Sequence, residues 1–279
     1  MKSSIFEIIK KITNLLIRFK LTRFIFFAMF EEISNFQTKI VNSKNLKEEF
    51  IFCTPNYLCR YRAKSLYLKE PDTIEWLDNF KDNSIFFDIG SNVGLYSVYA
   101  AKLKNSKVYS FEPSVFNLDL LAKNIHLNKL EEKIIIVPLP VNDQKKISFF
   151  NLTTIDKGAA FSTFDKNHDH NGDDLNTEFK FKVISSSLDD ITKDYFIELP
   201  DYIKIDVDGI EHLILKGSTN ILKNARSILI EVNDNFKYQK QEITNVLQKN
   251  NFEKQIDLRF SNESIIKNEI WNNKLFNKK

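Results

Sequence analysis

The sequence predicts an α/β protein whose parallel sheet is wound with helices on both faces and preceded by a helical extension. From Phe50 onward, short apolar runs of strand length alternate with longer stretches of helical periodicity. This alternation is typical of parallel strands joined by crossover helices. Before Phe50, apolar residues recur at helical spacing with cations between them. We therefore divide the chain into an amphipathic helical extension, residues 1–49, and an α/β domain, residues 50–279.

The composition limits the class of protein. With 279 residues, 43% of them hydrophobic, the chain is large enough to bury a full core. Its formal net charge of +3 does not indicate a nucleic-acid partner, for which a concentrated patch of Lys and Arg is expected. Cys53 and Cys59 are its only cysteines, which suits neither a disulfide framework nor a paired metal motif. This favours a reducing compartment and a cytoplasmic location.

The N-terminal stripe has two interpretations. No apolar run approaches the roughly 20 residues that cross a bilayer, and the longest candidate is FIFFAMF at 24–30. One interpretation is a basic amphipathic helix that lies on an anionic membrane and binds the protein peripherally to the inner membrane surface. The other is a helix packed on its own domain or on a second copy in a homodimer. The apolar positions are Ile5, Ile8, Ile9, Ile12, Leu15, Leu16 and Phe19, and the cations are Lys10, Lys11, Arg18, Lys20 and Arg23.

Strand and helix signals follow one another along the domain. Strands are expected at 85–88, 107–111, 134–141, 202–207 and 227–232, and helices at 93–104, 114–128, 210–224 and 241–249. Two prolines in the third strand are typical of an edge or a bend. The tail from Phe252 adds two weak strand-like runs. Residues 142–182 break the alternation, and their polar cluster DKNHDHNGDDLN predicts a long loop that covers the site.

That polar cluster also contains side chains that bind metals. His168, Asp169 and His170 lie near Asp165 and the pair at 173–174. Polar loops of this composition are common, however, and the rest of the chain offers no convergent ligand motif. We therefore expect no metal site.

The first strand of the domain ends in a carboxylate and a glycine-rich turn, FFDIGSNVG. Gly90 and Gly94 are spaced G-x-x-x-G, unlike the G-x-G-x-x-G of dinucleotide sites, and Asn92 tolerates a left-handed backbone. Asp88 at the mouth of the turn would repel a pyrophosphate, which disfavours a nicotinamide cofactor. It would attract an ammonium or a sulfonium, and S-adenosylmethionine carries both and no phosphate. The turn therefore favours S-adenosylmethionine.

The next strand ends in a second carboxylate. Glu112 follows Gly94 by 18 residues and precedes Pro113, close to the spacing at which an acidic residue binds a cofactor ribose. The alternative is that Glu112 only marks a helix start ahead of Pro113. Together with Asp88 and the two glycines, its position favours cofactor binding.

Several motifs in one order resemble the FkbM family of S-adenosylmethionine-dependent methyltransferases, from about Phe50 to Phe252. They are TPNYLCRYRA, EPDTIEWL, FFDIGSNVGLYSVYAA, YSFEPSVFNLDLLAKNIHLN, YIKIDVDGIEHLILKGS and SILIEV. Ser91 replaces a small residue of the family pattern and Asp208 replaces a Glu. The resemblance implies a class I methyltransferase fold, mostly parallel with an antiparallel final strand, and O-methylation of a sugar, glycan or natural-product hydroxyl. The expected cofactor-binding residues are Asp88, Gly90, Ser91, Asn92, Gly94, Glu112, Pro113 and Asp206.

The stretch KIDVDGIEHLILKG is the expected chemical end of the site. A sugar hydroxyl is a weak nucleophile, so transfer benefits from a base within hydrogen-bond reach. Strand alternation places Asp206 and Asp208 on one side with Lys204, and Glu211 and His212 follow. Asp206 is the leading candidate. The alternative for Asp208 and Glu211 is a capping box that closes the next helix, and for His212 a packed or surface position.

Two alternative functions would use the same fold. One is a non-catalytic scaffold or sensor that binds S-adenosylmethionine, although such a protein need not retain three carboxylates at strand ends. The other is a nicotinamide-dependent oxidoreductase, which Asp88 and the loop spacing disfavour.

Overall fold

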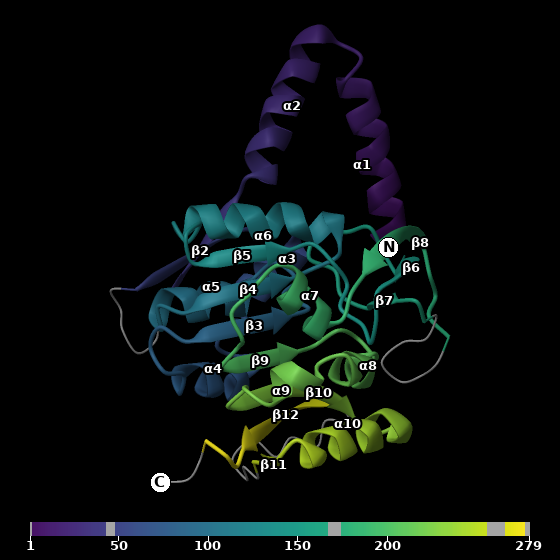
Figure 1. The fold of residues 1–279 in the computed structure, drawn as a ribbon. Helices are drawn as coiled ribbons and strands as arrows, with labels where there is room; N and C mark the ends of the chain where they lie inside the picture. The colour runs from purple at the N-terminus through teal and green to yellow at the C-terminus, as the bar shows by residue number, and fades with distance from the viewer. Residues whose placement is uncertain (1, 43–47, 167–173, 256–265, 277–279) are drawn as a thin grey trace.

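The computed structural model describes residues 2–42, 48–166, 174–255 and 266–276, which form a central sheet with helices on both faces (Figure 1). The seven strands of the sheet lie in the order β11-β12-β10-β9-β3-β4-β5. Neighbours from β10 to β5 are parallel, and β12 is antiparallel to both of its neighbours. This arrangement confirms the predicted class I methyltransferase fold with its antiparallel final strand. The strands are β3 (Ile85–Ile89), β4 (Lys107–Phe111), β5 (Ile134–Val137), β9 (Tyr202–Ile205), β10 (Ser227–Asn233), β11 (Phe252–Lys254) and β12 (Ile266–Asn273).

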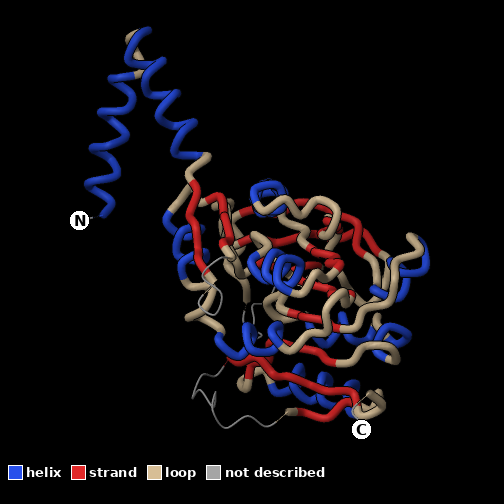
Figure 2. Tube along the Cα trace, turned by 90° about the vertical axis from the view of Figure 1, so that its left-hand side faces the viewer, coloured by secondary structure: helices blue, strands red, loops and turns tan. Residues whose placement is uncertain are grey.

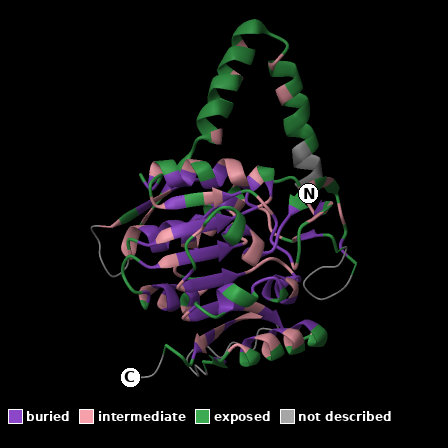
Figure 3. Cartoon of the chain, in the orientation of Figure 1, coloured by how far each residue is buried: buried purple, intermediate pink, exposed green. Residues whose placement is uncertain are grey.

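Alternate strand residues enter two separate cores. Phe87 packs with one group of helices and its neighbour Phe86 with the other, because successive side chains of a strand point to opposite faces. The first core receives α7 (Leu188–Asp194), α8 (Glu211–Lys216), α9 (Thr219–Leu222) and α10 (Lys237–Lys249); the second receives α4 (Pro71–Asp78), α5 (Leu95–Leu103) and α6 (Val115–Leu127). Burial on both faces explains why the central strands read as continuous apolar runs (Figure 3).

The predicted helix at 210–224 is two helices, α8 and α9, because the chain bends at Gly217. A Cβ at Gly217 would lie 2.6 Å from the carbonyl oxygen of Asn142, so this turn packs directly on a distant segment. The third predicted strand is confirmed as a sheet edge, with β5 ending at Val137 before its first proline.

The prediction of a long loop at 142–182 is wrong, because this segment forms three strands. β6 (Lys146–Leu152) pairs with β7 (Ser162–Phe164) and with β8 (Phe179–Ser185) in a separate antiparallel sheet. Phe150, Leu152 and Phe164 pack beneath it against Ile210, so the segment has a small core of its own. His168, Asp169, His170 and Asp173 lie outside the described residues.

The N-terminal extension forms two helices rather than one stripe, α1 (Lys2–Leu16) and α2 (Lys20–Ser34). Figure 2 shows this pair standing away from the domain. A hairpin follows, in which β1 (Gln37–Val41) pairs with β2 (Glu49–Cys53) across the expected domain boundary. The backbone amide of Cys53 donates to Asn124 of α6, 2.7 Å away, and α3 (Tyr57–Lys64) follows. Among the described residues, no helix is long and apolar enough to cross a membrane.

Candidate active site

A cavity of about 1240 Å³ opens at the carboxyl ends of the parallel strands, the position that the fold reserves for ligands. Apolar side chains, among them Phe111, Leu139 and Val141, form part of its wall. The structure brings six predicted site residues together there: Gly90, Asn92, Glu112, Pro113, Asp206 and Asp208.

The glycine-rich turn needs its glycines for steric reasons. Gly90 has φ +82°, and a Cβ there would lie 1.9 Å from the carbonyl oxygen of Asp206. Gly94 has the same φ, and its Cβ would lie 2.5 Å from the side chain of Leu121. Asn92 also adopts a positive φ of 52°, as expected of an Asn in a tight turn. The turn therefore packs directly on the strand that carries Asp206.

Glu112 is fixed in the cavity wall by backbone amides. The amide of Asn92 donates to its Oε2 at 2.9 Å and that of Ser114 to its Oε1 at 2.7 Å. Burial raises the pKa of Glu112 to about 7, although both amides oppose this shift. Ser114 is the N-cap of α6, so Glu112 also organises the helix start. The side chain of Asn117 also hydrogen-bonds to this carboxyl group, and a carboxyl group with two oxygens has lone pairs enough to accept from a ligand hydroxyl as well.

Asp88 lies behind the cavity rather than in its wall. Its side chain is 1% exposed and accepts a hydrogen bond from Ser97 at 2.6 Å. Burial raises its pKa, and Lys204 opposes the shift. Ser91 and Gly94 likewise lie outside the cavity wall. We predicted that Asp88 contacts the cationic end of a cofactor. In this structure its side chain does not reach the cavity in which that contact would form.

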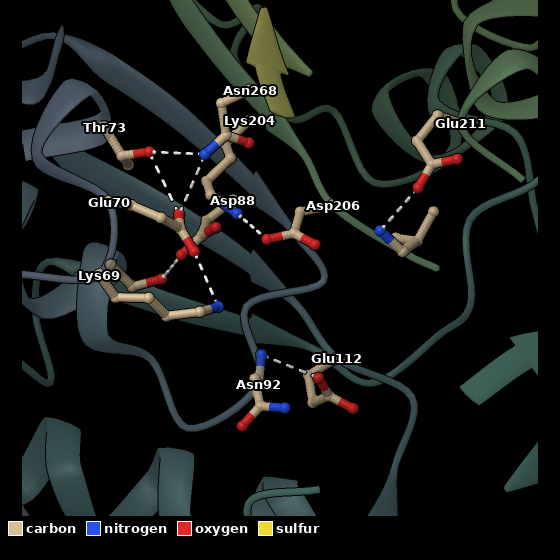
Figure 4. A network of polar contacts seen from close by, with 12 residues as sticks. Lys69, Glu70, Thr73, Asp88, Asn92, Glu112, Lys204, Asp206, Glu211 and Asn268 are labelled. Carbon is tan, nitrogen blue, oxygen red and sulfur yellow. Dashed lines mark hydrogen bonds and ion pairs between the residues drawn. The ribbon is translucent and has the colours of Figure 1, made fainter. Parts of the chain in front are cut away.

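Lys204 connects Asp88 to the cavity (Figure 4). Its ammonium is buried and lies 2.5 Å from Oδ2 of Asp206. Burial alone would lower the pKa of Lys204, but the carboxylates of Asp206, Glu70 and Asp88 outweigh burial and raise it. Asp206 is 27% exposed in the cavity, so the buried cation fixes a carboxylate that a ligand can reach.

Glu70 completes this network from the start of α4. Lys69 lies 2.9 Å from its Oε1, and Thr73 and Asn268 donate to its Oε2 at 3.2 Å (Figure 4). Burial opposes its ionisation, yet Lys204 and Lys69 lower its pKa to about 2. Sequence reasoning missed Glu70, because two of the partners that explain it, Lys204 and Asn268, lie far away along the chain.

Asp208 and Glu211 do not form the capping box considered above. Oδ2 of Asp208 accepts from the amides of Phe161 at 2.7 Å and Ser162 at 3.3 Å, so this carboxylate anchors the segment before β7. Phe161 and Ser162 line the cavity, so the segment 142–182 reaches the site, as predicted for a loop at this position. Glu211 turns inward and accepts from the amides of Val207 and Gly209, each at 3.2 Å.

Glu211 and His212 lie outside the cavity wall. Glu211 is 1% exposed, and burial raises its pKa to about 7. His212 is buried with its ring edge-on to Phe236 and Tyr238. This is the packed position that was the alternative for His212.

Glu231, at the end of β10, is a second cavity residue that sequence reasoning missed. Burial first, and then the neighbouring carboxylates with Asp206 foremost, raise its pKa well above the usual range. An acidic residue at the carboxyl end of an otherwise apolar strand, SILIEV, was the signal that could have identified it.

Carboxyl groups and cations both line the cavity. Asp206, Asp208, Glu231 and Glu112 contribute the carboxyl groups nearest the strand ends, and Arg62 and Lys69 are among the cations. In the described part of the chain, no three His, Cys, Asp or Glu side chains are grouped to hold a metal ion.

The sheet order, the glycine-rich turn and the acidic strand ends together define a class I methyltransferase fold. The family model described as the methyltransferase FkbM domain matches residues 88–254. The chain belongs to this family.

Two curated relatives are similar over part of the chain. The hexuronic acid methyltransferase AglP of Haloferax volcanii is 25% identical over 166 residues, which are 58% of this chain and 62% of that protein. The methyltransferase sdnD of Sordaria araneosa is 25% identical over 160 residues, 50% of this chain and 62% of that protein. A crystal structure of methyltransferase FkbM from Methylobacillus flagellatus KT aligns with a TM-score of 0.48 and 16% identity, covering 70% of this chain and 44% of that one.

Proposed function

We propose that the protein transfers a methyl group from S-adenosylmethionine to a hydroxyl of a sugar, glycan or natural product. The observation that carries this proposal is the combination in one cavity of the Gly90 turn, the buried Glu112 and the strand-end Asp206. Membership of the FkbM methyltransferase family supports the same reaction.

The cofactor-binding residues follow from the cavity wall. Glu112 is placed to accept hydrogen bonds from ribose hydroxyls, because both of its oxygens are already oriented by backbone amides. Phe111 and Leu139 line the same cavity and offer an apolar surface to an adenine ring. Asp206 carries negative charge toward the cationic end, and Asp88 adds charge from behind through the Lys204 network. When bound, S-adenosylmethionine supplies a methyl group activated on sulfonium.

Asp206 is the proposed proton acceptor for the hydroxyl. Lys204 holds Oδ2, which leaves Oδ1 to orient the hydroxyl and take its proton. Positioning the acceptor is a large part of catalysis, and a general base typically adds about 10²–10⁴-fold. Asp208 and Glu231 line the same cavity and are proposed to bind the acceptor's other hydroxyls. Glu211 and His212, which sequence reasoning also proposed as catalytic, support α8 instead.

We propose an acidic sugar as the first acceptor class to test. The relative AglP is a hexuronic acid methyltransferase by name. In this chain Arg62 lines the cavity, and its Nε donates to the carbonyl oxygen of Gly158 at 2.6 Å. The remaining guanidinium nitrogens can pair with a sugar carboxylate.

The experiment measures transfer of a labelled methyl group from S-adenosylmethionine to paired glucuronides and glucosides. We expect product with the wild type, more of it with the glucuronide, and a loss of about 10²–10⁴-fold in Asp206→Asn. Asp206→Asn should still bind the cofactor by calorimetry. Asp82→Asn, an exposed Asp outside the cavity wall, is the control and should be fully active.

Three other outcomes would contradict parts of the proposal. Cofactor binding without transfer to any hydroxyl acceptor would favour a scaffold or sensor. Binding of a nicotinamide dinucleotide in place of S-adenosylmethionine would favour an oxidoreductase. Full activity of Asp206→Asn would exclude Asp206 as the base.

A further inference from the structure

The N-terminal helical hairpin, α1 and α2 with their connection, is a feature that methyl transfer does not explain. In Figures 1 and 2 it projects from the α/β domain, and Figure 3 shows most of its described residues as exposed. α2 contains no buried residue. Of the 32 large apolar side chains exposed in the described chain, 14 lie between Ile8 and Phe36. About a tenth of the sequence therefore carries nearly half of this exposed apolar surface.

The apolar side chains are distributed differently on the two helices. On α1 they repeat at helical spacing through Ile8, Ile12 and Leu15 and form one face. On α2 they surround the helix: Phe24, Ile25 and Phe30 point in three different directions around its axis and are 72%, 48% and 61% exposed. A helix that is apolar on all sides is normally buried. Both helices therefore require a partner that supplies an extended apolar environment.

The charge of the hairpin identifies the kind of partner. Between Glu7 and Glu31 the sequence contains five cations and no Asp or Glu. Three of them, Arg18, Lys20 and Arg23, surround the connection between the helices, where Phe19 and Leu21 are 63% and 72% exposed. The partner must therefore bind apolar and positively charged side chains that lie within a few residues of one another in the hairpin.

We propose that this hairpin docks the protein on an anionic lipid surface. The acyl boundary accepts the phenylalanines, while lysine and arginine stems extend their charges to the lipid phosphates. A second copy fits less well, because packing the connections of two hairpins together would bring Arg18, Lys20 and Arg23 against the same three cations, while the acids Glu7, Glu31 and Glu32 lie toward the far ends of the helices. Each helix of 15 residues is about 22 Å long, too short for a hydrocarbon core of about 30 Å. The hairpin therefore lies in one leaflet of the bilayer and does not span it.

The test is flotation of the full-length protein with vesicles of phosphatidylcholine, with and without phosphatidylglycerol. We expect the protein to bind the anionic vesicles. Binding should weaken as salt is raised from about 0.1 to 0.5 M, because salt screens the attraction between the cations and the lipid phosphates. The triple variant Arg18→Gln, Lys20→Gln, Arg23→Gln should lower the partition coefficient by about fivefold per cation, on the order of a hundredfold in all. Phe24→Ser, Phe27→Ser, Phe30→Ser should also reduce binding.

The matched control removes three lysines elsewhere. Lys223, Lys237 and Lys249 are exposed on the domain and lie outside the cavity wall, so their replacement by Gln should leave vesicle binding unchanged. Three outcomes would overturn the proposal: no flotation with either vesicle, equal flotation with both, or a lipid-independent dimer that the Phe→Ser variant converts to a monomer. Each variant's cofactor affinity, measured separately, shows whether the domain itself is intact.

Discussion

At the residue scale, Lys204 explains how Asp206, the proposed proton acceptor, is held at the cavity. It is 1% exposed and pairs with Asp206, while Asp88 and Glu70 lie close enough to raise its pKa. The charge of one buried ammonium is thus shared among carboxylates from β9, β3 and the start of α4. Because Glu70 is also bound to Thr73 and Asn268, the position of Asp206 depends on elements from both ends of the sequence.

Removing this cation should be costly. Lys204→Met would leave neighbouring carboxylates without their shared positive charge, and we expect a loss of roughly 3 kcal/mol in the free energy of unfolding. Urea denaturation measures this change. Lys267→Met is the control, since its pair with Asp234 is about one-third exposed on each side, and it should cost no more than about 1 kcal/mol. Similar losses in the two variants would show that the buried network contributes no more than a surface pair.

Glu211 makes stability depend on pH. Burial raises its pKa to about 7 in the folded protein, against about 4.3 in an unfolded chain. Between these values the native state holds a proton that the unfolded state has lost, so the free energy of unfolding falls as pH rises from about 4 to 7. Glu112, with its pKa also raised to about 7, contributes in the same direction.

Glu211→Gln should flatten this dependence. The amide oxygen can still accept from Val207 and Gly209. In the wild type Gln239 donates from Nε2 to Oε2 of Glu211, while its own Oε1 is buried without a hydrogen-bond partner; a flip of the Gln239 amide lets this oxygen accept from the new NH₂ group. We expect the variant to melt at a higher temperature than wild type at pH 8 and to differ less at pH 5. Thermal unfolding across this range checks the result. Lower stability of the variant at pH 8 would contradict the burial argument.

At the element scale, the turn between β3 and α5 positions the proposed cofactor site by close backbone packing. Gly90→Ala would place a methyl group 1.9 Å from the carbonyl oxygen of Asp206 at φ +82°, so the turn or β9 must move. We expect a lower melting temperature and a loss of S-adenosylmethionine affinity of at least tenfold. Ser91→Ala, in the same turn, should leave both nearly unchanged. If Gly90→Ala binds as well as wild type, the packing of turn on strand does not determine the site.

The same scale shows what the sequence could predict. Apolar runs and helical periodicity located the parallel strands and the long helices, because burial on both faces leaves a clear local pattern. The sheet of β6, β7 and β8 was missed because the prediction extended the polar cluster between β7 and β8 over the whole segment, although FKFKV at the start of β8 alternates apolar and polar residues. The break at Gly217 depends on a contact with Asn142, which no local pattern reveals.

At the scale of the whole molecule, the cavity is assembled from distant segments. Local motifs identified Gly90, Asn92, Glu112 and Asp206, because each sits at a turn or a strand end with a recognisable pattern. They placed Asp88 in the cavity, whereas the structure places it behind the wall. A strand buried on both faces does not tell from its sequence which face a carboxylate occupies. Glu70 enters the account only through its tertiary neighbours, whereas the acidic end of SILIEV was an unused signal for Glu231.

The central claim, that this cavity binds S-adenosylmethionine through Glu112, is tested most directly by isothermal titration calorimetry. The full-length protein should bind S-adenosylmethionine at one site and should not bind NAD⁺. Glu112→Ala should weaken binding at least about tenfold, because it removes charge-assisted hydrogen bonds worth roughly 1.5–3 kcal/mol each. Its melting temperature confirms that the variant is folded. Unchanged affinity in a folded Glu112→Ala, or preferential binding of NAD⁺, would contradict the account.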